Sequence, residues 1–221
     1  MKNNIIIFGS GGHAKVVFWE IFELKKFNIL GFVDDLKKKN TCIVNYKEKK
    51  FFTLGKISEL SKIRYSGIIG VGDNHTRNKI YQQVILLKKK IKWETIVSNH
   101  AIVSKDVKIG EGTVIMSGCI IKNGTSIGRH CIINTSTSLD HDNIIEDFSS
   151  TGPSVTTGGG ALLKKFSHIG IGSVVKQKIS IGTNVVIGGN SFVNKNCQKN
   201  LLYFGNPIKK IKKIKIPTKY L

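Results

Sequence analysis

The sequence predicts an α/β N-terminal domain of the Rossmann-like half type, followed by an all-β parallel β-helix. Two patterns carry this prediction. The first is a strand, glycine-rich turn and helix pattern near the N-terminus, and the second is an apolar residue at every sixth position from residue 103 onwards. We expect the α/β domain to span residues 1–95, the β-helix residues 96–200, and a basic capping tail residues 201–221.

The N-terminal segment has the alternation of elements that forms a small parallel sheet. The stretch NNIIIFGSGGHAKVVFWEIFEL gives an apolar strand, a glycine-rich turn and a helical pattern that includes Val16, Val17, Ile21 and Leu24. A second apolar strand follows in ILGFVDD, and SGIIGVGDNHTRNKIYQQVILL repeats the scheme of strand, turn and helix. Such alternation predicts a parallel α/β unit.

The first glycine-rich turn predicts a nucleotide site. Residues 9–14 match the pattern GxGxxG/A, and Asp34 and Asp35 follow at the end of the second strand. This pattern is typical of nicotinamide enzymes, but the segment amounts to a single mononucleotide-sized half. Free N–H groups at a helix N-terminus attract any diphosphate, so we favour another nucleotide ligand over a turn that is purely structural.

The second pattern is an apolar repeat with a period of six. It continues over about ninety residues without a change of phase, and neither a helix nor a plain amphipathic strand has this period. Fourteen of the sixteen positions hold Val, Ile or Leu. The positions are Val103, Ile109, Ile115, Ile121, Ile127, Ile133, Leu139, Ile145, Thr151, Thr157, Leu163, Ile169, Val175, Ile181, Ile187 and Val193.

This period predicts a three-sided prism in which each hexapeptide forms one short strand and three hexapeptides form one coil. The repeated apolar residue points inward, and sixteen repeats make about five coils. Glycines beside it are expected to let the backbone turn each corner. They are Gly110, Gly128, Gly170, Gly182 and Gly188.

Composition excludes several classes of function. The net charge is +21 and the pI is about 9.9, which would suit a nucleic-acid-binding protein, but the lysines are scattered and we expect no nucleic-acid partner. The four cysteines lie far apart without a CxxC pair, so we expect neither a metal site nor a disulfide framework. The apolar run at the N-terminus is too short for a signal peptide or a membrane span, so we expect a cytoplasmic protein without a membrane partner.

One polar run within the repeats, NTSTSLDHDNIIEDFSS, places His141 between Asp140 and Asp142. This group would suit a surface turn, a metal site or a general base. A second histidine at ligand spacing is missing, which disfavours a metal. Because a carboxylate raises the basicity of an imidazole that titrates near neutral pH, the group favours proton transfer.

The combination of GSGGH, VDD, DHD and FGNPIKKI with hexapeptide repeats resembles the NeuD-type sugar acetyltransferases of the hexapeptide-repeat superfamily, which include enzymes that N-acetylate nucleotide-linked 4-amino sugars. The resemblance implies a left-handed β-helix, a homotrimer, and acetyl-CoA and a nucleotide sugar as substrates. It also implies that His141 is the catalytic base and Asp142 its partner, although the family often has Glu at that position. Asp140 is an alternative partner.

The sequence patterns and the resemblance together predict the binding residues. Gly11, Gly12, His13, Asp34, Asp35 and Asn134 are expected on the sugar-nucleotide side. Ser150, Ile171 and Gly189 are expected to contact acetyl-CoA, and Ser150 replaces a histidine that the family commonly has. We expect the first five of these residues to line a pocket that faces His141, within or between subunits.

Other polar residues receive structural interpretations. We expect His168 at a corner or on the surface, and His75, His100 and His130 on the surface or in packing. Thr151 and Thr157 need hydrogen-bond partners at core positions, and these are either each other or groups of the cofactor site. The lysines of the tail either are solvated or attract an anionic membrane or the phosphates of coenzyme A.

The leading hypothesis is acetyl-CoA-dependent N-acetylation of a nucleotide-linked amino sugar, with a UDP-linked 4-amino sugar as the expected acceptor, in bacterial surface glycan biosynthesis. O-acetylation of a sialic-type sugar acid and a non-catalytic sugar-nucleotide-binding protein are the alternatives.

Overall fold

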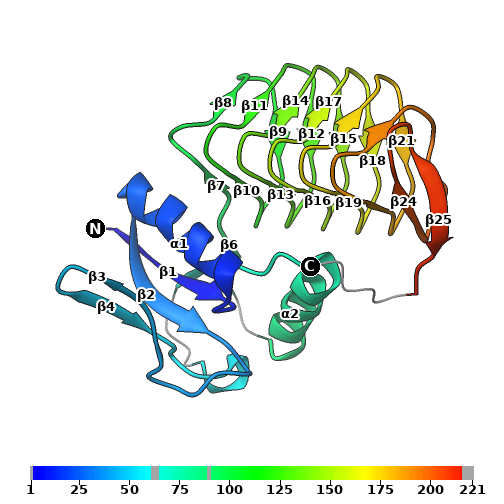
Figure 1. Ribbon diagram of the computed structural model, residues 1–221. Coiled ribbons are helices and arrows are strands. Elements are labelled where there is room, and N and C mark those ends of the chain that lie inside the picture. Colours follow the sequence, from blue (N-terminus) through cyan, green and yellow to red (C-terminus); the bar gives the residue numbers. More distant parts are fainter. Residues whose placement is uncertain (1, 61–64, 89–90, 216–221) are drawn as a thin grey trace.

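The computed structural model describes residues 2–60, 65–88 and 91–215. The chain forms a small α/β domain beside a prism of stacked β-coils, as Figure 1 shows. Both parts of the predicted fold are confirmed.

The front domain is a four-stranded parallel sheet with the strand order β2-β1-β5-β6. A short 3₁₀ helix, η1 (Ile57–Glu59), and a β-hairpin complete the domain, and the hairpin bridges to β2 between Phe32 and Thr53. The elements are β1 (Asn3–Phe8), α1 (Gly12–Leu24), β2 (Phe27–Val33), β3 (Cys42–Tyr46), β4 (Lys49–Phe52), β5 (Ser66–Ile69), α2 (Asn74–Leu86) and β6 (Lys92–Trp93).

The apolar run of β1 is explained by burial on both faces of the sheet. Ile5 and Ile7 pack in one core cluster with Val17 of α1, while Ile6 and Phe8 pack in a second cluster that includes Val84 of α2. A central parallel strand that is covered on both faces needs a continuous apolar sequence.

The prism is built from three sheets whose strands, except the last two of the chain, are two residues long. The first sheet contains β7 (Ile96–Val97), β10 (Val114–Ile115), β13 (Ile132–Ile133), β16 (Ser150–Thr151), β19 (His168–Ile169), β22 (Val186–Ile187), β24 (Leu201–Phe204) and β25 (Lys209–Lys213). The second contains β8 (Ile102–Val103), β11 (Ile120–Ile121), β14 (Ser138–Leu139), β17 (Thr156–Thr157), β20 (Val174–Val175) and β23 (Phe192–Val193). The third contains β9 (Lys108–Ile109), β12 (Ser126–Ile127), β15 (Ile144–Ile145), β18 (Leu162–Leu163) and β21 (Ser180–Ile181).

These strands make five complete coils and part of a sixth, in agreement with the repeat pattern. Each coil adds one parallel strand to each sheet, and residues 18 apart are paired, such as Ile115 with Ile133. The second residue of each strand points inward: Ile121, Ile133 and Ile187 are at most 1% exposed. In the first coil Ile109 is only partly buried, because no coil precedes it.

The prediction for the corner glycines gave the wrong physical reason. The left-handed backbone recurs at every sixth residue from 112 to 190, and nine of these residues are not glycine, Asp142 (φ 55°) among them. Gly110 does not have a positive φ. A Cβ at Gly110 would lie 2.6 Å from the backbone carbon of Gly128 in the next coil. Glycine is therefore needed there for the close stacking of coils.

The tail continues the prism as a hairpin. Strand β24 pairs in parallel with β22, and β25 pairs antiparallel to β24. Ile208 and Ile214 are buried, whereas all five residues of β25 are exposed. Residues 216–221 of the predicted tail lie outside the described residues.

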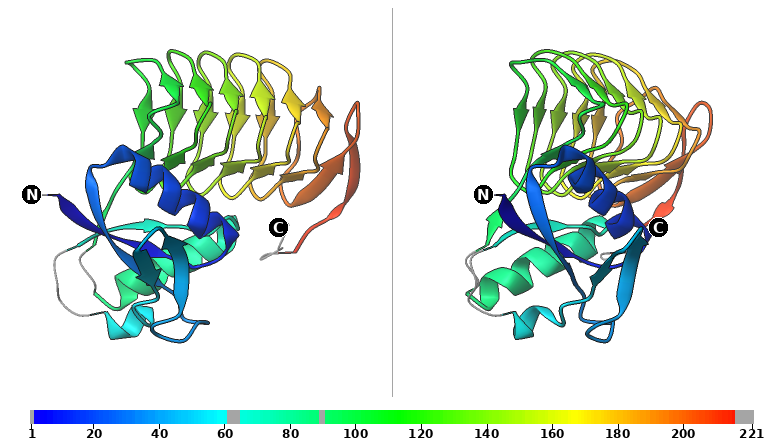
Figure 2. Two further views of the ribbon diagram at one scale, coloured as in Figure 1. Left: turned by 60° about the vertical axis from the view of Figure 1, so that its left-hand side comes forward. Right: turned by 90° about the vertical axis from the view of Figure 1, so that its left-hand side faces the viewer.

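The front domain lies against the first sheet of the prism (Figure 2), and polar side-chain contacts join the two parts. Arg77 of α2 is 1% exposed, and it donates to the carbonyl oxygens of Gly72 (2.8 Å) and His130 (2.7 Å). The carboxylate of Glu20 on α1 accepts a hydrogen bond from the Ser117 hydroxyl (2.8 Å). These contacts fix one end of each helix against the coils.

Candidate functional site

A hollow of about 520 Å³ lies over the glycine-rich turn of the front domain. It is lined by Gly11, Gly12, His13, Asp34 and Asp35, together with residues of the loop that follows β5 and of α2. Helix α1 begins at Gly12 without a side-chain cap, and a Cβ at Gly11 or Gly12 would meet no atom within 4 Å. The hollow thus combines open space with the N–H groups of a helix N-terminus, which favour an anionic group.

The two carboxylates in this hollow are held in place by hydrogen bonds. Asp34 accepts from the Ser10 hydroxyl (2.5 Å) and from the Leu36 N–H (2.9 Å). Asp35 accepts from the Ile57 N–H (2.9 Å) and from the amide of Gln83 (2.7 Å). Gln83 was missed in the sequence, because it belongs to α2 and lies 48 residues from its partner.

A second hollow of about 630 Å³ lies between the front domain and the prism. It is lined by Asn134, Ser150, Ile171 and Gly189 of the prism. His13 and Gly72 line both hollows, so the two adjoin. The structure thereby brings together residues that the sequence predicted for two different substrates.

His13 lies where the two hollows meet. Its Nε2 is buried and has no hydrogen-bond partner among the described residues. Burial, and next the positive charge of Arg77, lower the pKa of His13 to about 4. The imidazole is therefore neutral at neutral pH, and it adds no charge to the hollows.

The prediction that His168 lies at a corner or on the surface is wrong. It occupies the outward-facing position of β19, but the front domain covers this face, and the side chain is 8% exposed. Its Nδ1 lies 2.9 Å from the hydroxyl of Ser150, one coil away. Burial, followed by the charge of Arg77, lowers the pKa of His168 to about 4. His168 lines the second hollow.

The other histidines agree with the structural interpretations. His130 is buried and stacks on Phe148, His75 stacks on Phe166, and His100 is exposed. Thr151 does not pair with Thr157: its hydroxyl lies 3.0 Å from that of Thr137 and accepts from the Asn134 N–H. The hydroxyl of Thr157 has no partner among the described residues.

His141 lies at another corner of the prism, between β14 and β15, and lines neither hollow. The side chain is exposed, and its Nδ1 lies 2.7 Å from Asp142 Oδ2. The short aspartate therefore reaches the imidazole. Asp140 instead accepts from the backbone N–H of His141 (2.9 Å). The hydrogen bond to Asp142, followed by the charge of Asp140, raises the pKa of His141.

Glycine is required opposite the imidazole of His141. A Cβ at Gly159, which lies in the next coil, would come within 2.4 Å of Nε2. The ring thus rests directly on the backbone of the next coil while Asp142 holds its other nitrogen. Two fixed contacts orient the side chain even though it is exposed to solvent.

Within residues 2–60, 65–88 and 91–215, no three His, Cys, Asp or Glu side chains come together in a way that would hold a metal ion. Over the same residues, no helix is long and apolar enough to cross a bilayer.

Known proteins resemble the front domain and the chain as a whole. Residues 4–84 match the family model of the PglD N-terminal domain. A segment of 119 residues is 33% identical to UDP-N-acetylbacillosamine N-acetyltransferase of Bacillus subtilis, and it covers 52% of this chain. The chain spans about half (51%) of the length of that relative.

Two solved structures resemble nearly the whole chain. The acetyltransferase domain of PglB from Neisseria gonorrhoeae, in complex with acetyl coenzyme A, has a TM-score of 0.85 at 25% identity, over 96% of this chain and 100% of that one. A mutant of perosamine N-acetyltransferase from Caulobacter crescentus, in complex with CoA and GDP-perosamine, has a TM-score of 0.86 at 25% identity, over 95% of this chain and 97% of that one. The prism is thus a left-handed β-helix like those of these acetyltransferases, its front domain matches the PglD N-terminal domain, and nearly the whole chain is similar to sugar N-acetyltransferases.

Proposed function

We propose that the protein transfers the acetyl group of acetyl-CoA to the amino group of a nucleotide-linked amino sugar, with a UDP-linked 4-amino sugar as the expected acceptor. The observation that carries the proposal is the pair of adjoining hollows that share His13 and Gly72. One offers helix N–H groups to a diphosphate, and the other is a groove along the coils. The relatives described above are sugar N-acetyltransferases, which supports the same chemistry.

In this proposal the front hollow binds the nucleotide sugar. The diphosphate lies over Gly11 and Gly12, Asp34 and Asp35 bind hydroxyl or N–H groups of the nucleoside, and His13 and Asn134 contact the sugar. Acetyl-CoA lies along the second hollow beside Ser150, Ile171 and Gly189. Both ligands then meet near His13, where the hollows adjoin.

His141 is the proposed base. The acceptor nitrogen forms a bond to the thioester carbonyl carbon, the C–S bond breaks, and coenzyme A leaves as the thiolate. Nε2 of His141 takes the proton that the nitrogen loses, while Asp142 fixes the tautomer with the proton on Nδ1. A carboxylate partner strengthens the base, and the raised pKa of His141 agrees with this role.

Because His141 lines neither hollow of its own chain, the base must come from a neighbouring copy. We therefore propose a homotrimer in which the corner that carries His141 faces the hollows of the next subunit. Light scattering at micromolar concentration should give three times the mass of the chain, and a monomeric mass would contradict this arrangement.

Mixing two impaired variants tests whether the sites are shared. His141→Ala and His13→Ala are each expected to lose most of their activity, but subunits exchanged between them should regain part of it. In a mixed trimer, some sites combine an intact His13 of one chain with an intact His141 of the next. If each site lay within one chain, every site would lack one histidine and no activity would return.

The reaction itself is tested by thiol release from acetyl-CoA with a panel of UDP-, dTDP- and GDP-linked amino sugars and free sialic acids. We expect release with a nucleotide-linked amino sugar. His141→Ala should lower turnover by roughly 10²–10⁴-fold, with little change in the affinity for acetyl-CoA. Release with free sialic acid alone would establish O-acetylation instead, and no release with any acceptor would favour a binding protein.

A further inference from the structure

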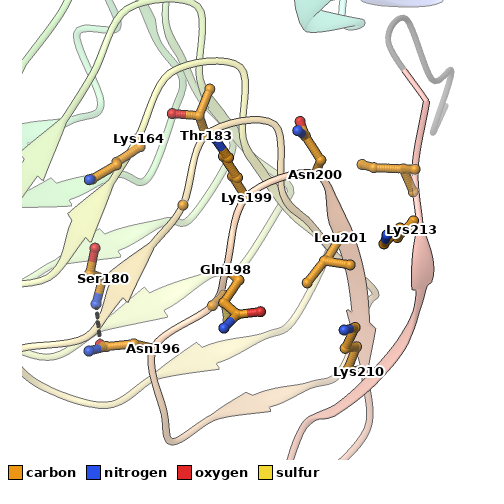
Figure 3. Close-up of a pocket in the computed structure, with 13 residues that line it drawn as sticks. Lys164, Ser180, Thr183, Asn196, Gln198, Lys199, Asn200, Leu201, Lys210 and Lys213 are labelled. Atoms are coloured by element: carbon orange, nitrogen blue, oxygen red, sulfur yellow. Dashed lines mark hydrogen bonds between the residues drawn. The ribbon is translucent and has the colours of Figure 1, made fainter.

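We propose that the C-terminal end of the prism carries a second anion site, distinct from the acetyl-transfer site, that binds a soluble diphosphate. Its place is a hollow of about 860 Å³, which is within the usual size range of small-molecule sites, about 300–1,000 Å³. Figure 3 shows its lining residues, which come from the last coils of the prism and from the tail hairpin that contains strand β25. None of them lines the other two hollows.

The charge of this end of the chain is entirely positive. Residues 148–221 contain twelve lysines and no Asp, Glu or Arg, although the whole chain has 14 acidic residues. Four of the lysines line the hollow: Lys164, Lys199, Lys210 and Lys213. With no carboxylate in the lining to neutralise them, these lysines create a positive potential that favours an anion.

Two asparagines in the lining present hydrogen-bond donors. The carbonyl oxygen of Asn196 accepts from the Ser180 N–H (2.8 Å), and that of Asn200 accepts from the side-chain amide of Asn184 (3.0 Å). Each oxygen is thus engaged by the protein. The NH₂ group of each side chain remains as the part that can serve a ligand, and it can only donate.

A diphosphate fits this combination of cations and donors. Its oxygens accept hydrogen bonds without offering donors in return, and lysine is a common partner for phosphate as a compact point charge. The lysines come from separate segments around a concave surface: the corner after β18, the last coil and strand β25. This arrangement suits a small ligand better than the flat surface of a membrane.

The experiment is calorimetric titration of the full-length protein with inorganic pyrophosphate at low salt. Lys199→Gln/Lys213→Gln removes two exposed charges from the hollow, and Lys49→Gln/Lys50→Gln removes two exposed charges from β4 of the front domain as the matched control. We expect the affinity of one site per chain for pyrophosphate to fall about tenfold or more in the first variant, and to stay within twofold of the wild type in the control. Binding of pyrophosphate over Gly11 and Gly12 would be unchanged in both variants.

The rate of thiol release from acetyl-CoA should stay within twofold of the wild type in both variants, because neither pair of lysines belongs to the proposed transfer site. Equal weakening in the two variants would show a general effect of net charge and overturn the proposal, as would a wild-type titration without the additional site. Vesicles of phosphatidylcholine with phosphatidylglycerol provide the last arm. If the protein floats with these vesicles through Lys199 and Lys213 but does not bind pyrophosphate, the ligand of this site is a membrane surface. That result would also overturn the proposal.

Discussion

The imidazole of His141 is held by one carboxylate and one backbone surface. Asp142 binds Nδ1 at 2.7 Å, and Gly159 leaves the space in which Nε2 lies. In the proposed mechanism this base depends on its orientation as much as on its pKa, because it has to meet an acceptor that the neighbouring subunit of the proposed trimer holds.

Gly159→Ala should lower turnover without unfolding the protein. The added methyl would lie 2.4 Å from Nε2 and displace the ring. We expect a loss of roughly 10-fold or more in kcat, measured by thiol release, with an unchanged melting temperature. In a His141→Ala background the same change should have little further effect, since the ring is gone. A full additional loss there would mean that Gly159 acts independently of His141.

Asp142→Asn tests the partner of the base. Removing the anion disfavours the imidazolium, so the acidic limb of the pH–rate profile should move to lower pH. The loss of turnover should be smaller than that of His141→Ala. The profile should be measured with two acceptors of different amine pKa. An acidic limb that Asp142→Asn leaves in place, but that moves with the pKa of the acceptor amine, would belong to the acceptor.

The hydroxyl of Ser150 and the ring of His168 form part of the polar lining of the second hollow. His168→Ala should raise the KM for acetyl-CoA by roughly 2- to 10-fold, the size of one hydrogen bond, and leave the KM for the nucleotide sugar unchanged. His100→Ala is the control, because that histidine is exposed and lines none of the hollows. An unchanged KM for acetyl-CoA would leave His168 with a packing role.

At this scale the sequence placed the lining residues well and their surroundings poorly. GSGGH and VDD each lie next to a strand end, so parallel-strand geometry brings them to one hollow. His168 was misjudged because the repeat shows only that its side chain points outward from the prism. What covers that face is the front domain, and the sequence does not show where that domain docks.

Within the coils, Thr151 and Thr157 provide a matched test of buried hydroxyls. Thr151→Val removes a hydroxyl that bonds Thr137 and Asn134, and should lower the free energy of unfolding by about 1 kcal/mol. Thr157→Val removes a hydroxyl without a partner among the described residues, and should raise it by about 1 kcal/mol. Chemical denaturation measures both, and equal changes would contradict the assignment of partners.

The strands of the prism were predictable because one repeated residue determines them. Each inward residue is buried by its neighbours 18 residues away, so the period of six contains both the strand positions and their pairing. The role of glycines such as Gly110 was not predictable from the same pattern. A glycine at a corner is equally compatible with a left-handed turn and with close stacking, and only the distances between coils distinguish them.

Across the whole molecule, Arg77 joins the two parts. It is fully buried and donates to carbonyl oxygens of its own domain and of the prism, which makes its contacts specific in geometry. The same positive charge is a cause of the lowered pKa values of His13, His130 and His168. The docking of the two parts therefore keeps three histidines neutral at their boundary.

These histidines make the stability of the folded protein dependent on pH. Burial is the largest cause that lowers the pKa of His130 to about 3, against 6.5 for the unfolded chain. Below pH 6.5 the unfolded state takes up a proton that the folded state does not, so stability is fully present above that pH and is lost as the pH falls towards 3. His13 and His168, with pKa values of about 4, act in the same direction.

His130→Phe isolates one of these contributions. The ring would remain among Tyr81, Trp93 and Phe148, and both ring nitrogens, which have no partner among the described residues, would be removed. Between pH 7 and pH 5 the variant should gain about 2 kcal/mol relative to the wild type, because it has no proton to take up on unfolding. Chemical denaturation at the two pH values measures this difference. A constant difference would mean that His130 already carries its proton in the folded protein, and that the boundary between the two parts admits a charge.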